Sequence, residues 1–328
     1  MKNHPIGHRR TTAQVMGGTA LVLLAAFSLA GCGSSDSSSG SGKTGKVKLA
    51  ASPNASALAI AIADKKGIFE KNGLDVSINK IDNQQLMPAA IASNQYNFSN
   101  ITPPLFLNAV LQHLPVVAAA GGNMENKDDP QFGLMVPEKS PVKSLGDLGG
   151  RKVATPTVGG NLSQCLQWHI NQKGLKPAHL VAVPFTNMKS QLSAGQVDAA
   201  LLQTPQTAAM TKSGYRMIED PCLSIGTPQQ TSFQMANSQW AKQNPNAVKA
   251  MQKSLEEAAA WAGKNPDETL KILSDWTGQP AADVAAFEMP QVVGVPPTAD
   301  DLGNWSEALT TLGAMKSKPD LSDAIFKG

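Results

Sequence analysis

The stretch Gly40-Ser41-Gly42-Lys43-Thr44 has the residue types of a phosphate-binding loop, in which glycine backbone and a lysine hold the phosphates of a nucleotide. That motif needs a glycine five positions before Gly42, where this chain has Ser37, and it needs a buried strand in front of it. The preceding residues are mostly serine and glycine. The segment is therefore interpreted as a flexible linker, and nucleotide chemistry is set aside.

Cys165 and His169 are the second candidate for chemistry, because side chains four positions apart can touch on a helix. A cysteine nucleophile also needs a lowered thiol pKa and donors for an oxyanion, and the surrounding sequence offers neither. No G-x-S-x-G, H-E-x-x-H or C-x-x-C pattern occurs. We expect no enzyme, no metal and no cofactor. Cys165 and Cys222 either pair as a disulfide in an oxidising compartment or remain two buried thiols.

The third cysteine, Cys32, closes a segment with the features of an export signal. Residues 1–15 carry three basic side chains and no acidic one, and residues 16–29 are apolar or small, too short a stretch to span a bilayer. Leu29-Ala30-Gly31-Cys32 is similar to a lipobox, the bacterial signal for attaching diacylglycerol to the cysteine. We predict a lipoprotein signal peptide over residues 1–32, lipidation at Cys32, and a Gly/Ser tether over residues 33–46.

These features predict a protein that is exported and lipid-anchored to the outer face of the cytoplasmic membrane, or periplasmic. An ordinary signal peptide with a chance cysteine is the alternative, and Arg9-Arg10 leaves both the general secretory and the twin-arginine routes open. Cleavage removes three of the 28 basic residues, which leaves 25 against 25 acidic ones. A neutral chain lacks the excess of positive charge with which proteins bind the phosphates of nucleic acid.

Strands and helices alternate over most of the remaining chain, which predicts α/β lobes with largely parallel sheets. The strands are expected at residues 47–51, 74–78, 98–101, 115–120, 151–155, 181–185 and 197–202. Ser56 and Asn187 are expected to cap helices. The apolar residues Val248, Met251 and Leu255 belong to one stripe of a long helix in a helical C-terminal third.

A short internal repeat predicts two similar lobes. The segment MPAAIASNQYNFSNITPP from Met87 aligns without gaps on MKSQLSAGQVDAALLQTP from Met188. Asn94 then matches Gly195, and these are the two residue types that best tolerate a left-handed helix cap. Both copies are interpreted as a helix, a left-handed cap, a polar turn, a strand and a proline-bearing loop.

Four segments carry a resemblance to a known family. They are IADKKGIFEKNGLDV (62–76), SLGDLGGRKVATP (144–156), QLSAGQVDAALLQTP (191–205) and the helical region 244–273. In this order they resemble the substrate-binding proteins of ABC importers, of the sulfonate, nitrate and taurine type. The resemblance implies a solute-binding lipoprotein with a type 2 periplasmic-binding-protein fold, in which two α/β lobes close on a small molecule by hinge motion.

The resemblance also implies the organisation of the chain and its partners. Lobe 1 is expected over residues 47–134 and 235–328, with the C-terminal helices, and lobe 2 over residues 135–234. The crossovers are placed near Phe132–Pro137 and Ser232–Ala236. A monomer would capture a small polar solute and deliver it to a permease with its ATPase. A sensor or other non-transport binding lipoprotein is the alternative, and an enzyme on the same fold is a weaker one.

The ligand is expected beyond the carboxyl ends of the strands, where open α/β sheets bind their ligands. That rule selects ten candidate ligand-binding residues: Ser52, Asn54, Thr102, Asn123, Thr157, Gly159, Gly160, Asn161, Gln203 and Thr204. Each could instead serve only as a turn or cap residue. The Gly159-Gly160 turn is expected to present backbone N–H groups to a carboxylate, sulfonate or other electron-rich group.

Arginine is nearly absent from the exported chain, where only Arg151 and Arg216 remain. Neither falls in a candidate loop, so the guanidinium clamp that binds carboxylate, sulfonate or phosphate in many proteins is missing. The sequence therefore favours a neutral or weakly charged polar solute over a strongly anionic one.

Overall fold

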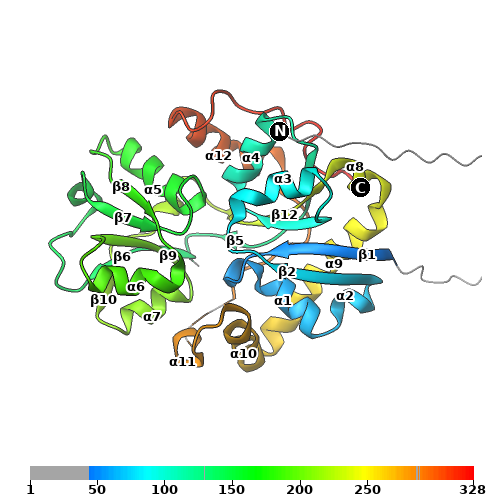
Figure 1. Ribbon diagram of the computed structural model, residues 1–328, viewed down its shortest axis with the longest axis horizontal. Coiled ribbons are helices and arrows are strands. Elements are labelled where there is room, and N and C mark those ends of the chain that lie inside the picture. The colour runs from blue at the N-terminus through cyan, green and yellow to red at the C-terminus, as the bar shows by residue number, and fades with distance from the viewer. Residues whose placement is uncertain (1–43, 129, 286, 288) are drawn as a thin grey trace, which may run out of the picture. The chain divides into compact units, whose positions relative to one another are not determined.

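Two five-stranded sheets form the framework of the computed structural model, which describes residues 44–128, 130–285, 287 and 289–328 (Figure 1). The predicted signal peptide, Cys32 and most of the predicted tether lie outside these residues. The first sheet has the strand order β2-β1-β3-β12-β4. Its strands are β1 (Thr44–Ala51), β2 (Leu74–Lys80), β3 (Phe98–Ile101), β4 (Val116–Ala120) and β12 (Phe233–Asn237).

The second sheet repeats this order. It runs β8-β7-β9-β6-β10, with strands β6 (Phe132–Pro137), β7 (Lys152–Thr155), β8 (His179–Ala182), β9 (Ala199–Gln203) and β10 (Tyr215–Met217). In each sheet one strand, β12 or β6, is antiparallel to both of its neighbours, and the remaining strands pair in parallel. The prediction of α/β lobes with mostly parallel sheets is confirmed.

The internal repeat is confirmed in detail. Asn94 and Gly195 both adopt left-handed backbone, with φ of 58° and 66°. Three positions later, Asn97 accepts a hydrogen bond from the backbone N–H of Lys48 at 2.8 Å, and Asp198 accepts one from the backbone N–H of Lys152 at 2.9 Å. Each polar turn is thereby tied to the strand beside it, β1 in one lobe and β7 in the other.

Helices pack around the two sheets. Those of the first sheet are α1 (Leu58–Lys65), α2 (Ile68–Lys71), α3 (Met87–Ala92) and α4 (Pro103–Leu111), with 3-10 turns η1 (Ala55–Ala57) and η2 (Gln84–Leu86). Those of the second are α5 (Asn161–Gln172), α6 (Phe185–Ser193) and α7 (Gln206–Thr211), with η3 (Leu145–Leu148) and η4 (Pro221–Ser224).

The C-terminal third is helical, as expected, and most of it packs on the first lobe. It comprises α8 (Ser238–Gln243), α9 (Pro245–Lys264), α10 (Pro266–Thr277), α11 (Ala281–Val284) and α12 (Ala299–Thr311). The apolar stripe of α9, including Val248, Met251 and Leu255, is buried against α1, α2 and β4. Among the described residues, no helix is both long and apolar enough to cross a bilayer.

The connection between the lobes differs from the prediction. Phe132–Pro137 and Phe233–Asn237 are strands, but each is paired inside one sheet. The paired crossing segments are β5 (Met124–Glu125) and β11 (Gln229–Gln230), which form an antiparallel two-stranded sheet of their own. We call residues 121–125 and 229–232, which contain these two strands, the hinge.

A third segment, residues 291–295, joins this hinge from the C-terminal third. Gly121 N donates to Gly294 O at 2.6 Å, and Met124 N donates to Gln291 O at 2.7 Å. A Cβ atom on Gly121 would lie 2.3 Å from the carbonyl oxygens of Val293 and Val295. Glycine is therefore required where these backbones meet.

Three local predictions were wrong. Asn54, not Ser56, caps the first helical turn, because its side chain accepts from the backbone N–H of Ser56 at 3.0 Å. Asn187 lies inside α6, which begins after Pro184. Strand β1 begins at Thr44, so the last residues of the predicted tether belong to the fold, and a strand stands where a phosphate-binding loop would need a helix.

Candidate ligand-binding site

A cavity of about 410 Å³ lies where strand-end loops of the two lobes face each other. Seven of the ten predicted ligand-binding residues line it: Ser52, Asn54, Thr102, Thr157, Gly160, Asn161 and Gln203. They follow or end the strands β1, β3, β7 and β9. The cavity therefore stands at the carboxyl ends of strands from both sheets, as the general rule for such sheets requires.

The first lobe supplies a polar wall to the cavity. Gln84 Nε2 donates to Ser52 Oγ at 2.7 Å, and Ser56 Oγ lies 2.6 Å from Asn54 Oδ1. The loop that carries these residues is anchored from α10, because Trp276 Nε1 lies 3.1 Å from the carbonyl oxygens of both Ser52 and Asn54. The C-terminal helices thus position this wall.

The cavity holds two buried polar groups that have no hydrogen-bond partner among the described residues. They are Thr102 Oγ1 and Gln203 Nε2, on residues whose exposed fractions are 9% and 8%. Leaving such groups unpaired costs roughly 1–3 kcal/mol each. A solute that offers them hydrogen bonds would recover this energy, so the two groups mark a polar binding position.

Three predicted residues do not line the cavity. Asn123 lies in the hinge, where it forms an isolated bridge with Val292. Thr204 turns toward Gln131, with its Oγ1 at 3.3 Å from Gln131 Oε1. Gly159 has a left-handed backbone with φ of 87° and shapes the turn before α5. A position after a strand is thus not enough to identify a lining residue, because the hinge and the turns contain the same polar residue types and glycines.

The turn before α5 does not present the free N–H groups that were expected. Gly159 N donates to Ser163 Oγ at 2.9 Å, Gly160 N donates to Thr157 O at 3.2 Å, and Leu162 N donates to Asn161 Oδ1 at 2.9 Å. The expectation of an anion position at these three groups is therefore wrong, because the turn satisfies them internally.

The sequence reasoning missed several lining residues. Asp82 and Gln84 follow β2, Thr231 lies in the hinge, Thr277 ends α10, and Phe132 begins β6. Asp82 and Gln84 could have been found by extending the strand-end rule a few positions further, because they come four and six positions after the predicted strand 74–78. Thr231 and Thr277 could not, since only the tertiary fold brings them to the cavity.

Both arginines of the described chain are held away from the cavity. Arg151 pairs with Asp198, with 3.1 Å between Nη1 and Oδ1. Arg216 donates to the backbone carbonyl oxygens of Ser140 and Val142. Neither arginine lines the cavity, and no lysine does.

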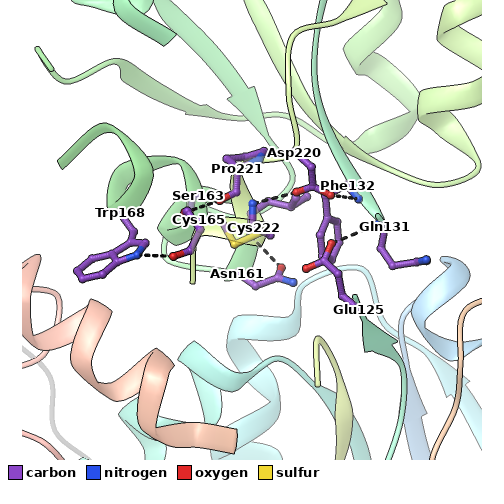
Figure 2. The surroundings of a disulfide bond; sticks show 12 residues. Glu125, Gln131, Phe132, Asn161, Ser163, Cys165, Trp168, Asp220, Pro221 and Cys222 are labelled. Atoms are coloured by element: carbon purple, nitrogen blue, oxygen red, sulfur yellow. Dashed lines mark hydrogen bonds between the residues drawn. A yellow bond between two sulfur atoms is a disulfide. The ribbon is translucent and has the colours of Figure 1, made fainter. Parts of the chain in front are cut away.

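A disulfide ties the second lobe to the hinge. Cys165 of α5 is bonded to Cys222 of η4, which lies on the segment that returns to β11 (Figure 2). Beside it, Trp168 Nε1 donates to Ser224 O at 3.0 Å. Because its sulfur is in a disulfide, Cys165 is not available as a nucleophile. Among the described residues no group of His, Cys, Asp or Glu side chains is arranged to hold a metal ion.

A buried carboxyl group, Glu125, and a half-buried one, Asp220, meet next to this disulfide. Asp220 accepts from the backbone N–H groups of Phe132 and Cys222 at 2.9 Å (Figure 2). Glu125 accepts from Gln229 Nε2 at 2.8 Å. Burial raises the pKa of the Glu125 carboxyl well above its ordinary value, and the adjacent Asp220 carboxylate raises it further. Burial also raises the pKa of Asp220. Glu125 is thereby favoured in its protonated form.

Comparison with known proteins gives the same fold. A protein of Brucella abortus described as a binding protein is 24% identical over 279 residues, which cover 80% of this chain and 84% of that protein. The periplasmic aliphatic sulphonate binding protein SsuA of Escherichia coli superposes with a TM-score of 0.72 at 19% identity, over 86% of this chain and 92% of that one. The alkanesulfonate-binding protein SsuA of Xanthomonas axonopodis superposes with a TM-score of 0.73 at 16% identity, over 87% of this chain and 99% of that one.

The fold and the cavity define the class: this is a two-lobed protein of the periplasmic-binding-protein fold. The sequence matches the family described as NMT1/THI5 like over residues 54–269. The chain belongs to that family. The resemblance to importer binding proteins is thereby confirmed at the level of family and fold.

Proposed function

We propose that this protein is the extracytoplasmic solute-binding component of an ABC importer. The observation that supports the proposal best is the cavity between the lobes, with unpartnered Thr102 Oγ1 on one side and Gln203 Nε2 on the other. A solute that satisfies both groups bridges the two lobes. Such a solute would favour the closed arrangement of the lobes, because it would bind that arrangement more tightly than the open one.

Thermal unfolding of the full-length protein against a panel of small solutes tests this function. A ligand at 100 times its Kd adds about 2.7 kcal/mol to the free energy of unfolding. A clear rise in Tm with one chemical class is the expected result. Mass spectrometry of the denatured protein checks for a solute carried over from expression. No shift and no carried solute would contradict a binding function.

Capture is proposed to be followed by delivery to a membrane permease with its ATPase, by a monomer that is lipid-anchored through Cys32. Uptake of the identified solute by cells, with and without the gene, separates transport from sensing. Loss of uptake is expected. Unchanged uptake with a changed transcriptional response would favour the sensor.

Anchoring is tested separately with Cys32→Ala. Two or more acyl chains give stable membrane binding, so the unmodified protein is expected in the membrane fraction and the variant in the soluble fraction. An unchanged distribution would contradict the lipid anchor and leave solute binding untouched.

A further inference from the structure

The cavity has an uneven distribution of charge. Asp82, which follows β2, is the single charged side chain among the lining residues. It forms no ion pair within the part of the chain that the structure describes. The lysine two positions earlier, Lys80, is engaged elsewhere, because its Nζ donates to Trp276 O at 2.8 Å and lies 4.4 Å from the centre of the Trp276 ring.

Two of the helix starts beside the cavity, those of α4 and α5, offer few backbone donors for an anion. Helix α4 begins with Pro103 and Pro104, which have no N–H at the two positions nearest the cavity. Three N–H groups around the start of α5 are bonded within their own turn, as described above. The described lining contains no lysine or arginine, so no positively charged side chain there balances a sulfonate or carboxylate.

The two lobes contribute different surfaces. Ser52, Gln84 and the Asp82 carboxylate come from the first lobe. The second lobe contributes most of the apolar lining residues: Phe132, Pro156, Leu162, Pro184 and Phe185. A solute that fits both walls has a charged or strongly polar end and an apolar body.

We propose, building on the solute-binding function above, that this cavity selects a small organic cation, whose protonated amine faces Asp82 and whose apolar body packs against Phe132 and Phe185. Hydrogen-bonding groups between the two ends reach Thr102 and Gln203. The charge preference is opposite to that of a sulfonate, the ligand named for the two structurally similar proteins.

A matched set of probes on one carbon skeleton tests the sign of the charge: benzylamine, benzamide, benzoate and benzenesulfonate. Binding is measured by calorimetry on the full-length protein and on Asp82→Asn. The control is Asp75→Asn, the same change at the opposite end of β2, outside the cavity. In parallel, the protein is equilibrated with a cell extract, and captured solutes are identified by mass spectrometry after denaturation.

The expected result is that the amine binds more tightly than the other probes, or that the captured solute is a cation. Asp82→Asn should weaken that ligand at least tenfold, with Asp75→Asn unchanged, and added salt should weaken binding to the native protein more than to Asp82→Asn. An anionic ligand whose affinity is unchanged or raised by Asp82→Asn overturns this inference and leaves the proposed function standing. Binding of no probe and capture of no solute overturns both.

Discussion

Gln85 of η2 and Val158 of the turn before α5 are joined by a hydrogen bond beside the cavity, next to the lining residues Gln84 and Thr157. Gln85 Nε2 donates to Val158 O at 2.8 Å, and the two residues belong to different lobes. Both are exposed at the surface. If the lobes open and close as proposed, loss of this hydrogen bond should change the balance between the open and closed forms.

Gln85→Ala is expected to shift that balance toward the open form. A single exposed hydrogen bond contributes about 0.5–1.5 kcal/mol, which corresponds to roughly a two- to tenfold change in the open-to-closed ratio. Small-angle X-ray scattering should show a larger radius of gyration. Gln95→Ala is the control, because Gln95 is exposed in the same lobe and its side chain makes no hydrogen bond to a described residue. Equal radii for both variants would contradict the role of Gln85.

The crowded hinge predicts opposite effects for two glycine substitutions. Gly121→Ala places Cβ 2.3 Å from backbone oxygens and should destabilise the protein by about 1–3 kcal/mol, because backbone atoms must move. Gly303→Ala, inside α12 with open space around it, should stabilise it by about 0.5–1 kcal/mol. Urea unfolding measures both. Similar values for the two variants would show that the three-segment hinge is not close-packed in solution.

The disulfide is expected to contribute substantially to stability. Cys165 and Cys222 are separated by 57 positions. Closing a loop of that length lowers the entropy of the unfolded state, which adds about 4 kcal/mol to the free energy of unfolding in the chain-entropy model. The double variant Cys165→Ala/Cys222→Ala should unfold at lower urea concentration, by about 2–4 kcal/mol. Reductant should destabilise the native protein and leave the double variant unchanged. Two alkylatable thiols in the folded, unreduced protein would contradict the disulfide.

The buried carboxyl pair predicts a pH dependence with a definite sign. Because the folded-state pKa of Glu125 is raised, the folded protein holds a proton that the unfolded chain releases above about pH 4.3. The free energy of unfolding should therefore fall as pH rises from that value toward the folded pKa, and then level. Asp220 contributes in the same direction.

Glu125→Gln removes this titration and keeps a neutral group beside Asp220. The variant should lose part of the decline in stability with rising pH, as measured by urea unfolding between pH 4 and 9. The control is Glu138→Gln, because this side chain is exposed and makes no hydrogen bond within the described part of the chain. A variant with the same pH profile as the native protein would show that Glu125 is already ionised in the fold.

Local sequence patterns were reliable for the strands and the repeat. Strand β3 has the predicted bounds Phe98–Ile101, and α5 ends at the predicted Gln172. The errors at Ser56 and Asn187 concern which of several cap-forming residues is used. Asn54 precedes Ser56 by two positions, and both are good caps, so local propensity could not decide between them.

The sequence by itself determined the approximate places of seven strands, the matched turns at Asn94 and Gly195, and seven of the residues that line the cavity. These features depend on neighbours a few positions away, through caps, alternation and left-handed turns.

Only the tertiary structure decided where the hinge lies, that Asn123 serves it, and that Asp82 is the one charge in the described lining. The hinge is made where residues 121–125, 229–232 and 291–295 meet, and segments so far apart in the chain leave no periodic pattern in any one of them.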